Sequence, residues 1–65
     1  MKPHQLRVVK EKADLDEKLA ALNEFGRGPI FPTLDPAEQE RLVRQSSLMD
    51  QYSVVLGQRI EAFKS

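Results

Sequence analysis

The second half of the chain repeats every seven residues in two columns of opposite character. One column is apolar throughout, and the other is polar or amphipathic. They are Leu42, Met49, Leu56 and Phe63, and Glu38, Gln45, Tyr52 and Arg59. Positions spaced alternately by four and three residues lie along one side of an α-helix. A coiled-coil seam is normally apolar in both columns, so the polar column either faces water or meets a partner or a ligand.

The first half of the chain has the pattern of one amphipathic helix, predicted over about residues 3–25. Pro3 suits the first turn of a helix, where its missing N–H costs no hydrogen bond. No further Gly or Pro occurs before Gly26, which is a candidate for the C′ residue that closes the helix. The apolar stripe is Val8, Leu15, Leu19 and Leu22. The pairs expected to support the exposed side are Arg7–Glu11, Lys10–Asp14, Lys12–Asp16 and Asp14–Lys18.

A second helix is predicted over about residues 36–63. Asp35 is a favourable N-cap, Pro36 suits the first helical position, and Glu38 stands where a capping box needs an acidic residue. Three apolar loop residues are expected to plug the end of the core: Ile30, Phe31 and Leu34. Two neighbouring helices with a short loop form an αα-hairpin, so we predict an all-α, two-helix antiparallel hairpin and a single domain over residues 1–65.

The apolar surface of the second helix is wider than one partner helix can cover. The additional apolar residues are Val43, Leu48, Val54, Val55 and Ile60. A chain of 65 residues buries a small core, and the absence of cysteine excludes a disulfide that would stabilise it. We therefore expect the hairpin to assemble into an oligomeric helical bundle.

Composition argues against several functional classes. Ten basic and ten acidic residues cancel, which gives no general attraction to DNA, RNA or anionic lipid. No apolar run is long enough to span a membrane, and the N-terminal residues lack the apolar segment of a signal peptide. The chain has one histidine, His4, and neither a Gly-rich phosphate loop nor a convergent acidic cluster. We expect no enzyme activity, no metal and no cofactor.

The polar edge of the second helix combines side chains that suit a small nucleotide: Arg44, Gln45, Tyr52 and Arg59. Arginine donates two parallel hydrogen bonds to phosphate, tyrosine offers a flat face to a base, and glutamine can bond to a base edge. An amphipathic rim is the commoner explanation of such residues. In that case Tyr52 is half-buried, the arginines lie over apolar surface, and Gln45 bonds across an interface.

Two segments of the chain form a further pattern. The first runs over residues 2–9 and continues over residues 11–19. The second covers residues 40–45, followed by Met49, Tyr52, Leu56 and residues 59–60. Together they resemble a family of small phage and prophage hairpin proteins, which includes the sponges that counter the CBASS and Thoeris immune systems of bacteria. The resemblance covers nearly the whole chain.

The resemblance implies a binding protein and not an enzyme. Members of that family hold cyclic oligonucleotide or cyclic ADP-ribose-type signals without cleaving them, and they assemble as oligomers, typically hexamers, with pockets between protomers. The implied location is the cytoplasm of the infected bacterial host. On this interpretation Arg44 and Arg59 hold phosphates, Tyr52 stacks, and Gln45 binds a base or ribose edge. The residues expected to close the pocket from a neighbouring N-terminus are His4, Arg7 and Lys10.

Two other interpretations stay open. The chain is a homo-oligomeric structural or protein-interaction module without a small-molecule ligand, in which the polar column fixes helix register. Alternatively it binds nucleic acid, although the balanced charge argues against that class.

Overall fold

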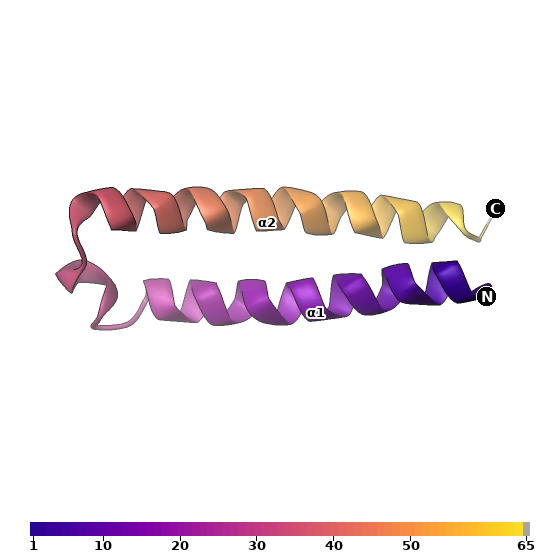
Figure 1. Ribbon diagram of the computed structural model, residues 1–65, viewed down its shortest axis with the longest axis horizontal. Helices are drawn as coiled ribbons and strands as arrows, with labels where there is room; N and C mark the ends of the chain where they lie inside the picture. Colours follow the sequence, from indigo (N-terminus) through magenta and orange to yellow (C-terminus); the bar gives the residue numbers. More distant parts are fainter. Residues whose placement is uncertain (65) are drawn as a thin grey trace.

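The computed structural model describes residues 1–64 and consists of two long antiparallel helices joined by a loop (Figure 1). Helix α1 spans Pro3–Gly26, α2 spans Pro36–Ala62, and a short 3-10 helix, η1, occupies Phe31–Thr33 in the loop. The molecule is a rod of 46 × 14 × 14 Å, with both chain ends at one end and the loop at the other. The predicted all-α hairpin is confirmed, and its helix ends shift by one residue from the predicted 25 and 63.

The helix starts follow from their first residues. Pro3 occupies the first turn of α1, and the Gln5 Oε1 atom accepts a hydrogen bond from the Lys2 backbone N–H at 2.9 Å. At α2 the Asp35 carboxylate accepts from the Ala37 N–H at 3.1 Å, which confirms the N-cap. The capping box predicted with Glu38 is wrong, because the Glu38 carboxylate instead accepts from Arg41 Nε at 2.8 Å.

The end of α1 differs from the sequence prediction. Gly26 is the last residue of the helix and has no positive φ, so it is not a left-handed C′ residue. Arg27 follows at φ −92°, and its N–H bonds to the carbonyl oxygens of Asn23 and Glu24, both at 3.2 Å. The Gly28 N–H then bonds to the Phe25 carbonyl oxygen at 3.1 Å. The last carbonyl groups are satisfied by these tight turns, and no left-handed residue is needed.

The two predicted apolar stripes face each other and form the core. Val8 is buried and Leu56 is fully buried, while the other stripe residues are partly exposed: Leu15, Leu19 and Leu22 on α1, and Leu42, Met49 and Phe63 on α2. In the loop, Phe31 and Leu34 are half-buried as predicted. The prediction for Ile30 is wrong, because its side chain is 57% exposed. The Ile30 carbonyl oxygen accepts hydrogen bonds from the Thr33 N–H and hydroxyl.

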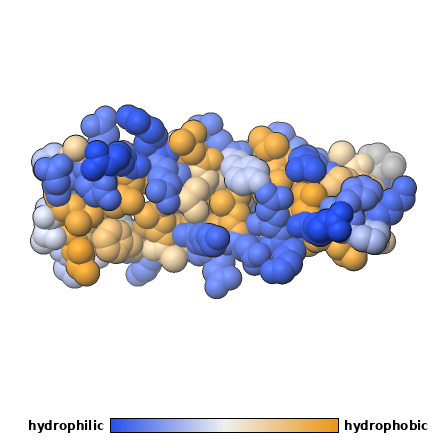
Figure 2. Space-filling view, viewed as in Figure 1, coloured by the Kyte–Doolittle hydropathy of each residue, from blue (hydrophilic) through white to orange (hydrophobic). Residues whose placement is uncertain are grey.

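The apolar excess of α2 remains uncovered in a single chain. Val43, Leu48, Val54 and Val55 are between 49% and 61% exposed, whereas Ile60 is half-buried. The space-filling view shows apolar groups scattered among polar ones along the rod (Figure 2). Neither long helix contains a stretch apolar and extended enough to cross a bilayer, as far as residues 1–64 are concerned.

Candidate functional site

A shallow hollow lies where the polar edge of α2 meets the charged edge of α1. We call it the Tyr52 hollow. It has a volume of about 500 Å³ and is lined by Arg7, Lys10, Glu11, Asp14, Leu15, Lys18 and Tyr52. Tyr52 is 45% exposed, and Gln45 and Arg59 of the same column are exposed as well. In a single chain these members of the polar column therefore face solvent.

The charges of the Tyr52 hollow are only partly compensated. Lys10 Nζ lies 3.0 Å from Asp14 Oδ2 in an exposed ion pair, which confirms the predicted Lys10–Asp14 pair. The predicted pairs Arg7–Glu11 and Asp14–Lys18 are not formed within the described chain, and the Asp14 carboxylate pairs with Lys10 and not with Lys18. Three basic side chains line the hollow against two acidic ones, so its formal charge is positive. Arg7 and Lys18 are available to an anion.

Among the seven candidate ligand residues, one chain brings together Arg7, Lys10 and Tyr52. His4 is exposed and does not line the hollow. Arg44 lies 3.9 Å from Glu40 Oε1 through its Nη2 atom, and Gln45 Nε2 lies 3.8 Å from the Met49 sulfur.

The two arginines of α2 cannot act on one small ligand within a single chain. Arg44 and Arg59 are separated by about four helical turns, or roughly 22 Å along the axis at ~1.5 Å per residue. That distance is too long for the phosphates of one small cyclic nucleotide. If both bind the same molecule, they come from different protomers.

A polar cluster between the helices adds Ser53, which was not anticipated from the sequence, to the predicted Lys12–Asp16 pair. Lys12 Nζ donates to Asp16 Oδ2 at 2.7 Å and to Ser53 Oγ at 3.1 Å, and the Ser53 hydroxyl donates to Asp16 Oδ1. Ser53 is buried, with 8% of its surface exposed. The Lys12–Asp16 pair predicted from the spacing is confirmed, and the Asp16 side chain, which is 45% exposed, lies at the edge of the helix contact. The available signal was the pair of serines, Ser46 and Ser53, spaced seven apart beside the apolar column.

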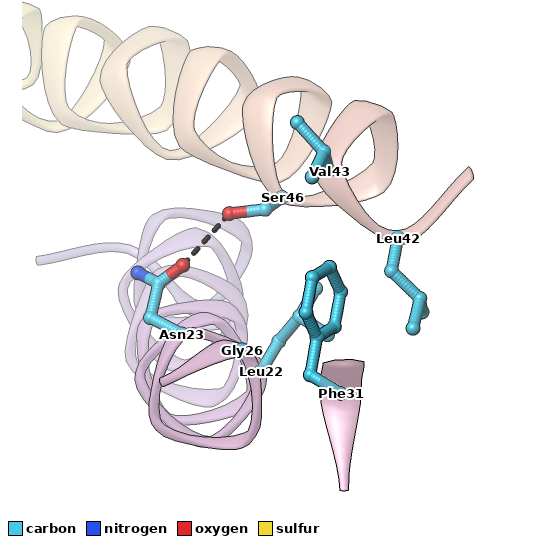
Figure 3. A pocket seen from close by; sticks show the side chains of 7 residues that line it. All are labelled: Leu22, Asn23, Gly26, Phe31, Leu42, Val43 and Ser46. Atoms are coloured by element: carbon cyan, nitrogen blue, oxygen red, sulfur yellow. Dashed lines mark hydrogen bonds between the residues drawn. The ribbon is translucent and has the colours of Figure 1, made fainter. Parts of the chain in front are cut away.

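A second, smaller hollow of about 200 Å³ lies at the loop end (Figure 3). Its walls are Leu22, Asn23, Gly26, Phe31, Leu42, Val43 and Ser46. The Phe31 ring lies between the helices there, and the Ser46 hydroxyl donates to Asn23 Oδ1 at 2.8 Å on the polar side. None of the seven candidate ligand residues lines this hollow. In the part of the chain that is described, no three His, Asp or Glu side chains gather as a metal site.

The family assignment comes from a match over almost the whole chain. The model of the Sequestin family matches residues 2–62. The chain belongs to the Sequestin family. Sequestin is the family of phage sponges that act against CBASS and Thoeris, so the resemblance drawn from the sequence is confirmed. No curated protein and no solved structure matches the chain.

Membership in Sequestin supports a phage sponge-like role for this hairpin. The matched range includes both helices and all seven candidate ligand residues. The ligand-binding role of each of those residues stays a prediction.

We expect the polar cluster of this Sequestin hairpin to make its stability sensitive to acid. The hydrogen bonds from Lys12 and then from Ser53 hold the pKa of Asp16 below its ordinary value, against an opposing effect of burial. A carboxylate with a lowered pKa in the folded state stabilises the fold above its unfolded pKa of about 3.9, and that contribution is lost as the pH falls through the folded value. We expect the urea midpoint of the wild type to fall below about pH 4, and that of Asp16→Asn to fall less.

The matched control for this experiment is Asp14→Asn, because Asp14 is exposed and its Lys10 pair lies on the surface. It should follow the wild-type pH dependence. Parallel acid profiles for the wild type and Asp16→Asn would contradict the assignment of this effect to Asp16.

Proposed function

We propose that the chain is a sponge that binds and sequesters cyclic oligonucleotide or cyclic ADP-ribose-type immune signals without cleaving them. It thereby inhibits anti-phage defence in the cytoplasm of the infected bacterium. The observation that carries this proposal is the Tyr52 hollow, in which a half-exposed aromatic ring lies among basic side chains. Membership in the Sequestin family supports the same role.

The side chains of the hollow fit the chemistry of such a ligand. A tyrosine ring stacks on a base, because every base has a flat π-face, and stacking contributes about 1–3 kcal/mol per base. The Arg7 guanidinium presents a planar set of donors that matches a phosphate, and Lys10 and Lys18 add positive charge nearby. Glu11 is an acceptor for ribose hydroxyl groups at the same site.

A neighbouring protomer completes the site in this proposal. Leu48 and Val55 flank Tyr52 on the same side of α2, four residues before and three after it, and both are about half exposed. Assembly through this apolar surface, as a hexamer or another homo-oligomer, covers these side chains. It also brings Arg44, Gln45 and Arg59 of one chain toward the hollow of another, with His4 from a nearby N-terminus.

Holding the signal requires no bond to be broken. The residues of the hollow provide stacking, charge and hydrogen bonds, and the single histidine of the chain lies outside it. The mechanism is stoichiometric: each occupied site removes one signal molecule from the host effector, so protection depends on protein concentration and affinity.

Calorimetry with a panel of cyclic di- and trinucleotides and cyclic ADP-ribose isomers tests the proposal. We expect at least one panel member to bind with micromolar or better affinity, and to be recovered intact by chromatography after the protein is denatured. Arg27→Ala is a control, because Arg27 is an exposed loop residue paired with Glu24 and should leave binding unchanged. Millimolar or absent binding across the panel would overturn the proposal, and recovery of a cleaved ligand would overturn its non-enzymatic part.

A homo-oligomeric interaction module is the second candidate function, and the exposed apolar residues of α2 favour it. Such a module would bury Leu48 and Val55 in the same way but would show no response to any nucleotide. Native mass spectrometry distinguishes the two candidates, because a sponge isolated from infected cells retains the mass of its ligand on the oligomer.

A further inference from the structure

Two hydrogen bonds of the same kind cross the hairpin at matching positions. The Ser46 hydroxyl donates to Asn23 Oδ1 at 2.8 Å, and the Ser53 hydroxyl donates to Asp16 Oδ1. The two serines are seven residues apart on α2, and their two acceptors are seven residues apart on α1. We call this pair of bonds the serine ladder.

Both bonds of the serine ladder specify the same alignment of the two antiparallel helices. A slip by about one helical turn would move Ser53 away from Asp16, toward Leu19 in one direction, and would move Ser46 away from Asn23 at the same time. Apolar side chains discriminate weakly between such alignments, because one leucine can replace another in a contact. Ser53 is buried, and a buried hydroxyl that loses its partner is unfavourable, so the Ser53–Asp16 bond fixes register where apolar pairs do not. The Ser46–Asn23 bond is exposed and adds a second, weaker preference for the same alignment.

A third contact supports the same alignment. The Lys12 ammonium donates hydrogen bonds to both Asp16 and Ser53, and the Lys12 side chain lies against Gly57 of α2. A β-carbon at residue 57 would lie 3.3 Å from Lys12 Cε, closer than ordinary van der Waals contact. Glycine inside a helix lowers helix stability, and at this position it leaves room for the Lys12 side chain.

We propose that the serine ladder, together with Lys12 and Gly57, fixes the axial register of the hairpin and thereby assembles the Tyr52 hollow. Tyr52 precedes Ser53 in the chain, so the register decides which side chains of α1 lie beside the Tyr52 ring. The members of the ladder are positioning residues and do not line the hollow. The register itself is independent of the proposed function, and only the effect on ligand binding rests on it.

The test measures register without a ligand. The chain has no cysteine, so spin labels attached at Glu17→Cys and Gln51→Cys report one distance across the hairpin when labelled protein is diluted with unlabelled protein. Tyr52 is the single tyrosine and tryptophan is absent, so quenching of intrinsic fluorescence reports on Tyr52 alone. We expect Ser46→Ala and Ser53→Ala each to broaden the distance distribution and to change the quenching of Tyr52, and the double variant to do so more strongly.

Two further variants make the result specific. Ser47→Ala removes an exposed serine beside Ser46 and should match the wild type in both measurements. The exchange Asn23→Ser with Ser46→Asn restores a hydrogen bond with donor and acceptor reversed, and should restore a narrow distribution.

Each outcome decides the proposal. If the single variants keep the wild-type distances and quenching, the bonds contribute stability and not register, and the proposal is overturned even if the double variant unfolds. If ligand binding is weakened at least tenfold by Ser53→Ala together with a broadened distribution, the link from register to site is supported. A broadened distribution with unchanged affinity for a ligand found in the calorimetric panel would overturn that link alone.

Discussion

Replacing Tyr52 by alanine is expected to weaken ligand binding roughly 5- to 150-fold, the range that corresponds to about 1–3 kcal/mol of base stacking. Tyr52 supplies the aromatic face of the hollow and is half exposed in a single chain, so its removal takes away stacking area without leaving a cavity in the hairpin core. Isothermal titration with the best ligand of the panel measures the change.

The matched control is Tyr52→Phe, which keeps the ring and should retain most of the affinity. Arg44→Ala separates the two candidate functions further. In a sponge, Tyr52→Ala and Arg44→Ala reduce binding and leave the subunit number unchanged. In an interaction module they alter only stability or oligomer size. If the Tyr52→Ala variant binds the ligand with the affinity of the wild type, Tyr52 is not part of the binding site.

Leu56→Ala should destabilise the hairpin by about 2–5 kcal/mol, the range observed when a buried leucine is truncated. Leu56 is fully buried, and within residues 1–64 it shares the buried apolar core with Val8. A loss of this size is comparable with the whole stability of a small domain, so we expect the variant to be largely unfolded at 25 °C. Circular dichroism at 222 nm measures the helix content of the variant, and urea unfolding measures its free energy of unfolding.

The control for this prediction is Gln58→Ala, because Gln58 is exposed and lies two residues from Leu56 on the same helix. It should change the free energy of unfolding by less than about 0.5 kcal/mol. A cost below about 1 kcal/mol for Leu56→Ala would mean that the core of the assembled protein lies elsewhere, on the apolar surface that a single chain leaves exposed.

The architecture could be predicted because it depends on local and periodic signals. The seven-residue column through Leu42 and Leu56 places one side of α2 against α1, and the Asp35-Pro36 pair marks where α2 begins. The exposure of Leu48 and Val55 follows from the same periodicity. These features need only the spacing of residue types along one helix.

The bonds from the serines of α2 to α1 could not be predicted, because they depend on which residues of the two helices stand opposite each other. Asp16 and Ser53 are 37 positions apart in sequence, and Asp16 alone has the surroundings of an ordinary surface carboxylate. The end of α1 was missed for a related reason. Gly26 is compatible with a left-handed cap, but the tight turns through Arg27 and Gly28 satisfy the same carbonyl groups.

The candidate site was predicted in part. Tyr52, Arg7 and Lys10 come from different helices and meet in one hollow. Lys18, from the same polar edge of α1, joins them there. Arg44 and Arg59 fall on one edge of α2 as their spacing requires, but a shared helical edge does not bring residues four turns apart to one ligand.

The fit of Lys12 against Gly57 has a genetic consequence. Because a β-carbon at residue 57 would lie 3.3 Å from Lys12 Cε, a larger residue there requires the Lys12 side chain to shift. We therefore expect larger residues at position 57 to occur preferentially together with shorter side chains at position 12. Correlated changes at positions 12 and 57 among related phage sequences would therefore indicate the alignment of the two helices without a structure.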